Sequence, residues 1–132
     1  MSFKPDGYSS MSPYVIVADA RAHLAFADAV FGAERLRFLE RTDGTVEHAE
    51  IRIDDTVVMF CEAGGGADYD VNLHLYCPDP DALMARAAEA GAIVLQPVSD
   101  REDGDRRGGF RGPKGVAWWV SRRTASGGSE PR

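Results

Sequence analysis

The sequence predicts an α+β fold built from two copies of one strand–helix–three-strand module. The phrase "VADARAHLAFADAVFGA" at residues 17–33 returns in altered form as "CPDPDALMARAAEAGA" at residues 77–92. Each phrase follows a short apolar run and precedes three segments with strand-like composition. The offset is 60 residues between Asp19 and Asp79 and 59 between Gly32 and Gly91, so one residue was gained or lost inside the helix.

The first module is expected at residues 11–63. An apolar run at 12–19 predicts a buried strand, and Asp19 can cap a helix over residues 20–31 that Gly32 ends in the left-handed conformation. The next two segments are joined by an Asp-Gly pair, which is typical of a hairpin. The predicted strands after the helix are 34–41, 46–53 and 54–62.

The second module is expected at residues 69–123, after a Gly-rich join at 64–68. Asp79 and Pro80 begin a helix over residues 80–90, and Gly91 stops it. The predicted strands are 71–77, 92–99, 105–112 and 115–122. We expect a flexible N-terminal arm at residues 1–10 and a disordered tail at 124–132, outside a single domain at 11–123. A module of this size cannot bury both faces of its sheet, so two modules are expected to form curved mixed sheets around a cavity.

Composition limits the functional classes. The chain has 132 residues, of which 44% are hydrophobic and 27% charged, as in soluble globular domains. It has no apolar run near the roughly 20 residues that span a bilayer, and its start does not resemble a signal peptide. Cys61 and Cys77 suggest free thiols, hence a cytoplasmic protein. The net charge of −6 argues against nonspecific binding to nucleic acid or an acidic membrane and is compatible with a neutral or cationic small-molecule partner.

Four phrases in this order resemble the vicinal oxygen chelate superfamily, the glyoxalase / bleomycin resistance protein / dioxygenase group, and within it the PhnB-like branch. They are "SPYVIVADARAHLAFADAVFGAE", "VEHAEIRIDDTVVMF", "LHLYCPDPDALMARAAEAGA" and "DRRGGFRGPKGVAWWVS", which together run from Ser12 to Ser121. The resemblance implies the two-module fold and a homodimer. The branch's usual Asp-Pro-Phe-Gly appears as "GPKG" at residues 112–115, a departure from its pattern.

The resemblance also implies where a metal would bind. Many members hold a divalent ion with His and Glu on the first and last strands of each half. Those positions correspond here to Ser12, the region of Glu62, Asn72 and Trp119. Only Glu62 is a strong ligand, whereas a catalytic divalent site usually needs three. We therefore expect no cofactor, and a divalent metal is disfavoured.

Strand alternation identifies the candidate site residues. One polar set, His48, Glu50 and Arg52, lies opposite Ala49 and Ile51. A second set, Asn72, His74 and Tyr76, lies opposite Leu73 and Leu75 in the same way. Trp118 and Trp119 are adjacent, so one should be in the core and the other should line the cavity or a dimer contact. The hypothesis assigns catalytic roles to His48, Glu50 and His74, and ligand-binding roles to Asn72, Tyr76, Trp118, Trp119 and Arg52. His23 is interpreted as structural or exposed.

Three functions stay open at the level of sequence. The first is a small-molecule-binding protein that takes an apolar or aromatic ligand without a conventional metal centre. The second is an enzyme of the same superfamily, a lyase, isomerase or demethylubiquinone-methyltransferase-like protein, which uses His and Glu for acid–base chemistry. The third is a dimeric scaffold whose cavity is vestigial.

Overall fold

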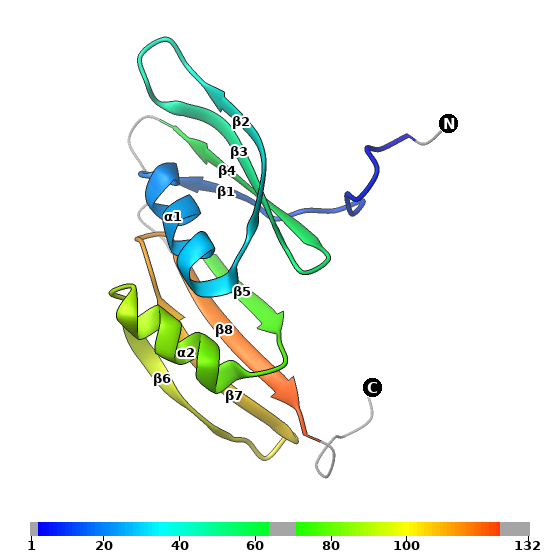
Figure 1. The fold of residues 1–132 in the computed structure, drawn as a ribbon, viewed down its shortest axis with the longest axis vertical. Helices are drawn as coiled ribbons and strands as arrows, with labels where there is room; N and C mark the ends of the chain where they lie inside the picture. Colours follow the sequence, from blue (N-terminus) through cyan, green and yellow to red (C-terminus); the bar gives the residue numbers. More distant parts are fainter. Residues whose placement is uncertain (1–2, 64–70, 125–132) are drawn as a thin grey trace. The chain divides into compact units, whose positions relative to one another are not determined.

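The computed structural model describes residues 3–63 and 71–124 and divides the chain into two compact units. Unit 1 is Met1–Tyr69 and unit 2 is Asp70–Arg132. Each unit is a four-stranded sheet with one helix (Figure 1). The predicted join at 64–68 lies outside the described residues, as does the predicted tail except for Thr124.

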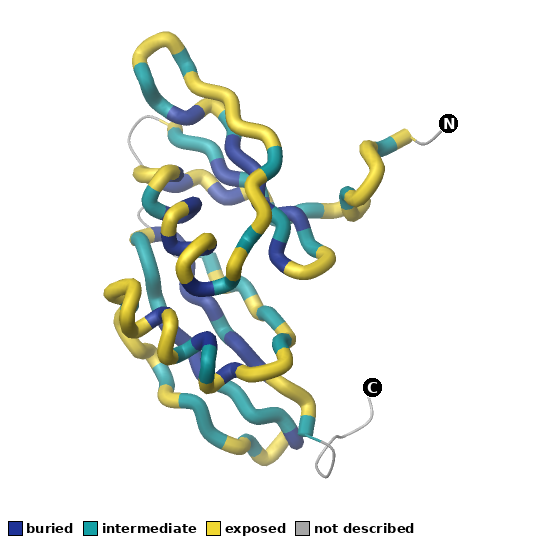
Figure 2. The backbone as a smooth tube through the Cα atoms, in the orientation of Figure 1, coloured by how far each residue is buried: buried dark blue, intermediate teal, exposed yellow. Residues whose placement is uncertain are grey.

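Unit 1 contains one helix between its first and second strands. Its sheet has the order β1-β4-β3-β2, in which β1 runs parallel to β4 and the other pairs are antiparallel. The central strands carry most of the buried residues, whereas β2 is exposed along most of its length (Figure 2). The elements are β1 (Tyr14–Val17), α1 (Ala20–Phe31), β2 (Glu34–Glu40), β3 (Val46–Ile53) and β4 (Thr56–Glu62).

Unit 2 repeats this plan. Its sheet has the order β5-β8-β7-β6, with β5 parallel to β8. The elements are β5 (Val71–Tyr76), α2 (Pro80–Glu89), β6 (Ile93–Asp100), β7 (Asp105–Arg111) and β8 (Val116–Arg123). The predicted doubled module is therefore confirmed within each unit. The cavity expected where the two modules meet stays a prediction.

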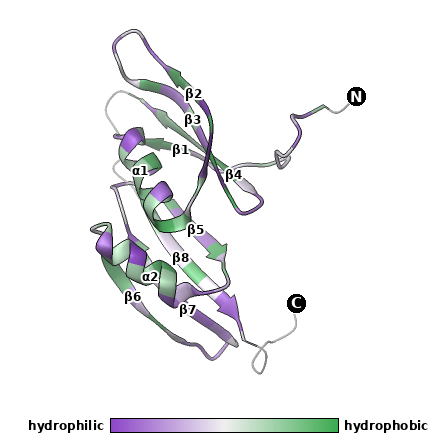
Figure 3. Ribbon diagram, viewed as in Figure 1, coloured by the Kyte–Doolittle hydropathy of each residue, from purple (hydrophilic) through white to green (hydrophobic). Residues whose placement is uncertain are grey.

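Both helices begin at the aspartates that the sequence indicated. The Asp19 side chain accepts a hydrogen bond from the Ala22 amide at 3.0 Å, and that of Asp79 accepts one from the Ala82 amide at 3.1 Å. Gly32 ends α1 with a φ of 62°. The helices mix hydrophobic and hydrophilic residues (Figure 3), because only one side of each covers its sheet.

The sheet of unit 1 has a helix side and a helix-free face. On the helix side, Ala49, Ile51 and Phe60 are fully buried, and the imidazole of His23 stacks on Phe60 with a centroid distance of 5.2 Å. His23 is therefore a core residue, which settles the choice left open by the sequence in favour of a structural role. Alternation places the opposite set on the helix-free face: Tyr14, His48, Glu50, Arg52 and Met59.

The sheet of unit 2 divides in the same way. On the helix side, Arg106 on β7 makes two hydrogen bonds to Asp81 of α2, at 2.8 and 2.9 Å. Trp118 pairs with Phe110 on this side, and both are buried. The helix-free face of unit 2 carries Asn72, His74, Tyr76, Asp105, Arg107, Trp119 and Ser121.

The hairpin turn after the second strand of each unit is repeated almost atom for atom. In unit 1 the Gly44 amide donates to the Arg41 carbonyl at 3.0 Å, and in unit 2 the Gly104 amide donates to that of Arg101 at 3.2 Å. Both glycines have positive φ, 88° and 93°. The side chain of Asp43 accepts a hydrogen bond from the Thr45 amide at 2.9 Å. In unit 2 the side chain of Asp103 accepts one from the Asp105 amide at 3.0 Å. The two turns are 60 residues apart, the same offset as the helix starts.

Candidate functional site

A buried carboxylate lies on the helix-free face of unit 1. Glu50 is only 3% exposed, although it is on the side of the sheet that no helix of unit 1 covers. Its Oε1 accepts a hydrogen bond from the hydroxyl of Tyr8, and its Oε2 lies 2.6 Å from Nε2 of His48. The ring of Tyr14 lies beside His48, with 6.0 Å between the centroids. We call Tyr8, His48 and Glu50 the Glu50 cluster.

Hydrogen bonding keeps this carboxylate ionised. Burial alone raises the pKa of the Glu50 carboxyl, but the hydrogen bonds from Tyr8 and His48 bring the pKa below its ordinary value. The backbone amide of Arg37 contributes in the same direction. That amide lies at an irregularity between Arg35 and Phe38, where the register of β2 against β3 shifts. The hydrogen bond between Tyr8 and Glu50 raises the pKa of the Tyr8 hydroxyl, so Tyr8 is the neutral donor.

The segment before β1 reaches this face through two residues. Besides the bond from Tyr8, Nη2 of Arg52 donates to the Gly7 carbonyl at 3.1 Å. Gly7 has a φ of 83°, and a Cβ added there would lie 2.8 Å from Arg52 Nη2. Arg52 also binds Glu34 at 2.8 Å. Arg52, which was predicted to bind a ligand, thus has two protein partners, Gly7 in the predicted N-terminal arm and Glu34 on β2.

An indole dominates the helix-free face of unit 2. The benzene ring of Trp119 lies against Gly109, where an added Cβ would be 2.4 Å from both Cε3 and Cζ3. Its Nε1 donates to Oδ1 of Asn72 at 2.9 Å, which fixes the plane of the ring. The indole is half-buried, so part of its surface is open.

Polar groups surround this indole. Nε2 of His74 lies 2.8 Å from Oγ of Ser121, and the His74 ring packs edge-on against Tyr76 at 4.6 Å. The Tyr76 hydroxyl donates to Asp105 at 3.1 Å, and Arg107 lies 3.6 Å from the same carboxylate. Burial, and then the charge of Arg107, lower the pKa of the His74 imidazole, so the neutral ring is favoured.

The predicted residues fall into two groups, one in each unit. Unit 1 brings together His48, Glu50 and Arg52, and unit 2 brings together Asn72, His74, Tyr76 and Trp119. Trp118 is the core tryptophan, 3% exposed on the helix side, so its proposed ligand contact is corrected. Sequence reasoning missed Tyr8, Ser121, Asp105 and Gly109. Alternation with Trp119 could have indicated Ser121, whereas the segment around Tyr8 has no periodic signal.

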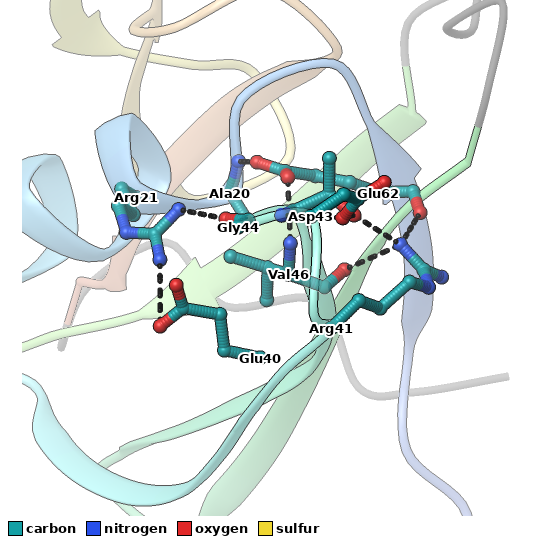
Figure 4. Close-up of polar contacts among 9 residues, drawn as sticks. Ala20, Arg21, Glu40, Arg41, Asp43, Gly44, Val46 and Glu62 are labelled. Atoms are coloured by element: carbon teal, nitrogen blue, oxygen red, sulfur yellow. Dashed lines mark hydrogen bonds and ion pairs between the residues drawn. The ribbon is translucent and has the colours of Figure 1, made fainter.

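The one strong metal ligand that the resemblance implied has another role. The carboxylate of Glu62 accepts the backbone amides of Ala20 at 2.7 Å and Val46 at 2.8 Å (Figure 4). It therefore satisfies the first amide of α1, where a negative charge is favourable. Within residues 3–63 and 71–124, no three His, Cys, Asp or Glu side chains are grouped so that they could hold a metal ion. The expectation that no metal binds stays a prediction.

Comparison with known families identifies the chain. Residues 11–120 match the model of the Glyoxalase/Bleomycin resistance protein/Dioxygenase superfamily. The chain belongs to this superfamily. A relative from Mycobacterium bovis, an uncharacterized protein, is 32% identical over 121 residues, which cover 83% of this chain and 80% of the relative. An uncharacterized protein of Mycobacterium tuberculosis is also 32% identical, with 71% of its length covered.

Several solved structures share the fold. TioX from Micromonospora sp. ML1 matches with a TM-score of 0.74 and 24% identity, over 87% of this chain and 98% of that one. A PhnB protein from Bacillus cereus, described as a putative 3-demethylubiquinone-9 3-methyltransferase, has a TM-score of 0.71 and 16% identity over 86% and 99%. FosX from Listeria monocytogenes, a fosfomycin resistance protein solved with Mn(II) and sulfate, has a TM-score of 0.66 and 14% identity over 90% and 95%. At these identities the likeness is one of fold.

None of the described helices combines the length and the apolar character that crossing a bilayer requires. The cytoplasmic location expected from the sequence stays a prediction.

Proposed function

We propose that the protein binds a small aromatic or apolar molecule on the helix-free face of its sheets. The observation that carries this proposal is the fixed, half-buried indole of Trp119, with its ring held between Gly109 and the hydrogen bond to Asn72. A ring whose orientation is already set loses little entropy when a planar ligand stacks on it. His74 and Tyr76 add polar groups beside it that can orient such a ligand.

Catalysis by acid–base chemistry is the second candidate, and the Glu50 cluster favours it. If neutral His48 donates its Nε2 proton to Glu50, Nδ1 is left as an acceptor that can take a proton from a substrate. A carboxylate that orients an imidazole in this way is a common arrangement in general-base sites. For any substrate found, His48→Gln should abolish turnover while binding is kept; turnover that persists in this variant would exclude the role.

Two further parts of the proposal concern the state of the protein. We propose that it works as a homodimer, as superfamily members often do, and without a conventional metal centre. The commitment of Glu62 to two backbone amides supports the second part. Light scattering at micromolar concentration tests the first. Calorimetric titration with Zn, Ni, Fe and Mn tests the second, and sub-micromolar binding would overturn it.

A ligand screen with site variants tests the binding proposal. Planar aromatic compounds should be screened by quenching of tryptophan fluorescence, and any hit titrated against Trp119→Ala and His74→Ala by calorimetry. Losing one anchor of a binding site costs on the order of 1–3 kcal/mol, so each change should weaken binding about 5- to 150-fold.

The control should lie in the same unit but away from this face. Glu89→Ala is suitable, because Glu89 is an exposed residue at the end of α2 on the other side of the sheet. His23→Ala would be a poor control, since His23 is packed on Phe60 in the core. Affinity that is unchanged in both site variants, with folding intact, would mean that the ligand binds elsewhere and that these polar faces are structural.

A further inference from the structure

We infer that the Glu50 cluster is a binding site for a neutral hydroxyl group on an aromatic ring, and that the chain's own Tyr8 occupies it. This inference deepens the proposed function, because the cluster lies on the helix-free face of unit 1. It names the class of ligand, a phenol, and identifies the segment before β1 as the competitor for the site.

The carboxylate of Glu50 requires hydrogen-bond donors. Glu50 is buried and ionised, and such a group needs a donor for each oxygen. His48 serves Oε2 from the neighbouring position on the same face of β3, so this donor is supplied by the sheet itself. The donor for Oε1 is Tyr8, 42 positions away in sequence, on a segment that belongs to no strand or helix. The sheet thus supplies His48 and the Arg37 amide of β2, whereas Tyr8 is a donor from outside the sheet.

The charges around Glu50 select the kind of donor that a ligand can offer. A ligand carboxylate at this place would be repelled by Glu50. A ligand ammonium would be attracted by Glu50 but opposed by Arg52 and Arg37, whose charges also act on the Tyr8 hydroxyl. A neutral hydroxyl meets neither repulsion, and it forms a strong hydrogen bond with a carboxylate. The phenol of Tyr8 meets this requirement, so a free phenol would meet it too.

The segment that carries Tyr8 can leave the site without unfolding of the sheet. Residues 3–13 contribute no strand or helix to unit 1. Two hydrogen bonds join this segment to β3, from Arg52 to the Gly7 carbonyl and from Tyr8 to Glu50, and the Pro13 carbonyl accepts the Met59 amide of β4. A segment outside the strands and helices opens at a lower free energy than the sheet does. A ligand with the same hydroxyaryl group can thus displace Tyr8 without disturbing the core of unit 1.

The test uses p-cresol, which is the side chain of tyrosine, with the full-length protein. In Tyr8→Ala the site is vacated, and p-cresol should bind with 1:1 stoichiometry in a calorimetric titration. Binding to the wild type should be at least about 10-fold weaker, because Tyr8 competes. Toluene, which lacks the hydroxyl, should bind Tyr8→Ala about 10-fold or more weakly than p-cresol, since it cannot reach Glu50 with a donor. The double variant Tyr8→Ala/Glu50→Gln should lose this preference for p-cresol.

A second variant keeps the test decisive if Tyr8→Ala folds poorly. In Gly7→Ala the new methyl group lies 2.8 Å from Arg52 and strains a φ of 83°, so docking weakens while Tyr8 is retained. Its affinity for p-cresol should rise above that of the wild type. The signals of His48 in an NMR titration should shift with p-cresol in both variants.

Three results would overturn the inference. They are equal affinity of Tyr8→Ala for p-cresol and toluene, equal affinity of Gly7→Ala and wild type for p-cresol, and p-cresol binding that does not depend on Glu50. They would remove the unit 1 site from the proposed function and leave standing the part of it that rests on Trp119 and His74 in unit 2. Conversely, if Trp119→Ala and His74→Ala bind every hit as the wild type does while p-cresol binds at the Glu50 cluster, the inference stands and the site in unit 2 fails.

Discussion

Gly109 allows the indole of Trp119 to lie on the sheet, and Gly109→Ala is predicted to destabilise the protein. Alanine suits a strand better than glycine by about 0.5–1 kcal/mol, and Gly109 has no positive φ, so without a neighbour the change would stabilise. The new Cβ would instead lie 2.4 Å from two ring carbons of Trp119. Carbon atoms in contact are normally about 3.5 Å apart or more, so the ring must move by about 1 Å.

The cost of that movement can be bounded from the contacts of the indole. The shift breaks the 2.9 Å hydrogen bond to Asn72, a loss of about 0.5–1.5 kcal/mol. Overpacking adds about 1–3 kcal/mol, and the lower end applies because the half-buried ring has room to swing outward. After the gain in strand propensity, Gly109→Ala should lower the free energy of unfolding by about 0.5–2 kcal/mol.

The assay is a double-mutant cycle with Trp119→Ala, measured by urea unfolding and far-UV circular dichroism. In the Trp119→Ala background the clash is absent, so Gly109→Ala should become neutral or stabilising. The coupling between the two sites should be about 2 kcal/mol. If Gly109→Ala has the same effect in both backgrounds, or stabilises the wild type, the indole does not rest on Gly109 and the orientation argument for ligand stacking fails.

Two further predictions concern a backbone-binding carboxylate and a titrating imidazole. Glu62→Gln should lower the free energy of unfolding by about 1–3 kcal/mol, because an amide can accept only one of the two backbone N–H groups that the carboxylate binds; an unchanged urea midpoint would show that the contacts are dispensable. An NMR titration should find the pKa of His74 below its ordinary value, and Arg107→Ala should raise it by removing a nearby positive charge. Since the folded pKa is the lower one, His74 stabilises the fold above its unfolded pKa, and this contribution is lost as the pH falls through the folded pKa. A stability curve between pH 5 and 7 that His74→Gln does not flatten would contradict this assignment.

The periodic parts of the sequence predicted the fold well. Both helices begin at the aspartates that the repeat pointed to, and alternation placed His74 on the face opposite Leu73. These features are local, so a short window of sequence contains the information. The same reasoning could have placed Glu62 on the helix side, because it lies two positions after the core residue Phe60 on one strand.

The contacts that sequence reasoning missed are long-range. Tyr8 reaches Glu50 across 42 positions from a segment without periodicity, so no local pattern indicates it. The position of the Trp119 ring depends on Gly109 in the neighbouring strand. In the sequence, a pair of glycines in a charged stretch is more readily interpreted as a turn. The choice between Trp118 and Trp119 required the sheet register, which fixes the side of α2.

The repeated hairpin turn has a consequence for how the chain can change in length. The residue missing between Asp79 and Gly91 is regained before Arg101, so the two turns keep their 60-residue offset. The stretch that absorbs the change contains β6, which has eight residues where β2 has seven, and both lie at a sheet edge with irregular register. The edge strands β2 and β6 therefore accommodate changes in the length of the chain. Insertions and deletions can accumulate there while the inner strands hold His48, Glu50 and Trp119 in place, so ligand preference and helix length can evolve separately.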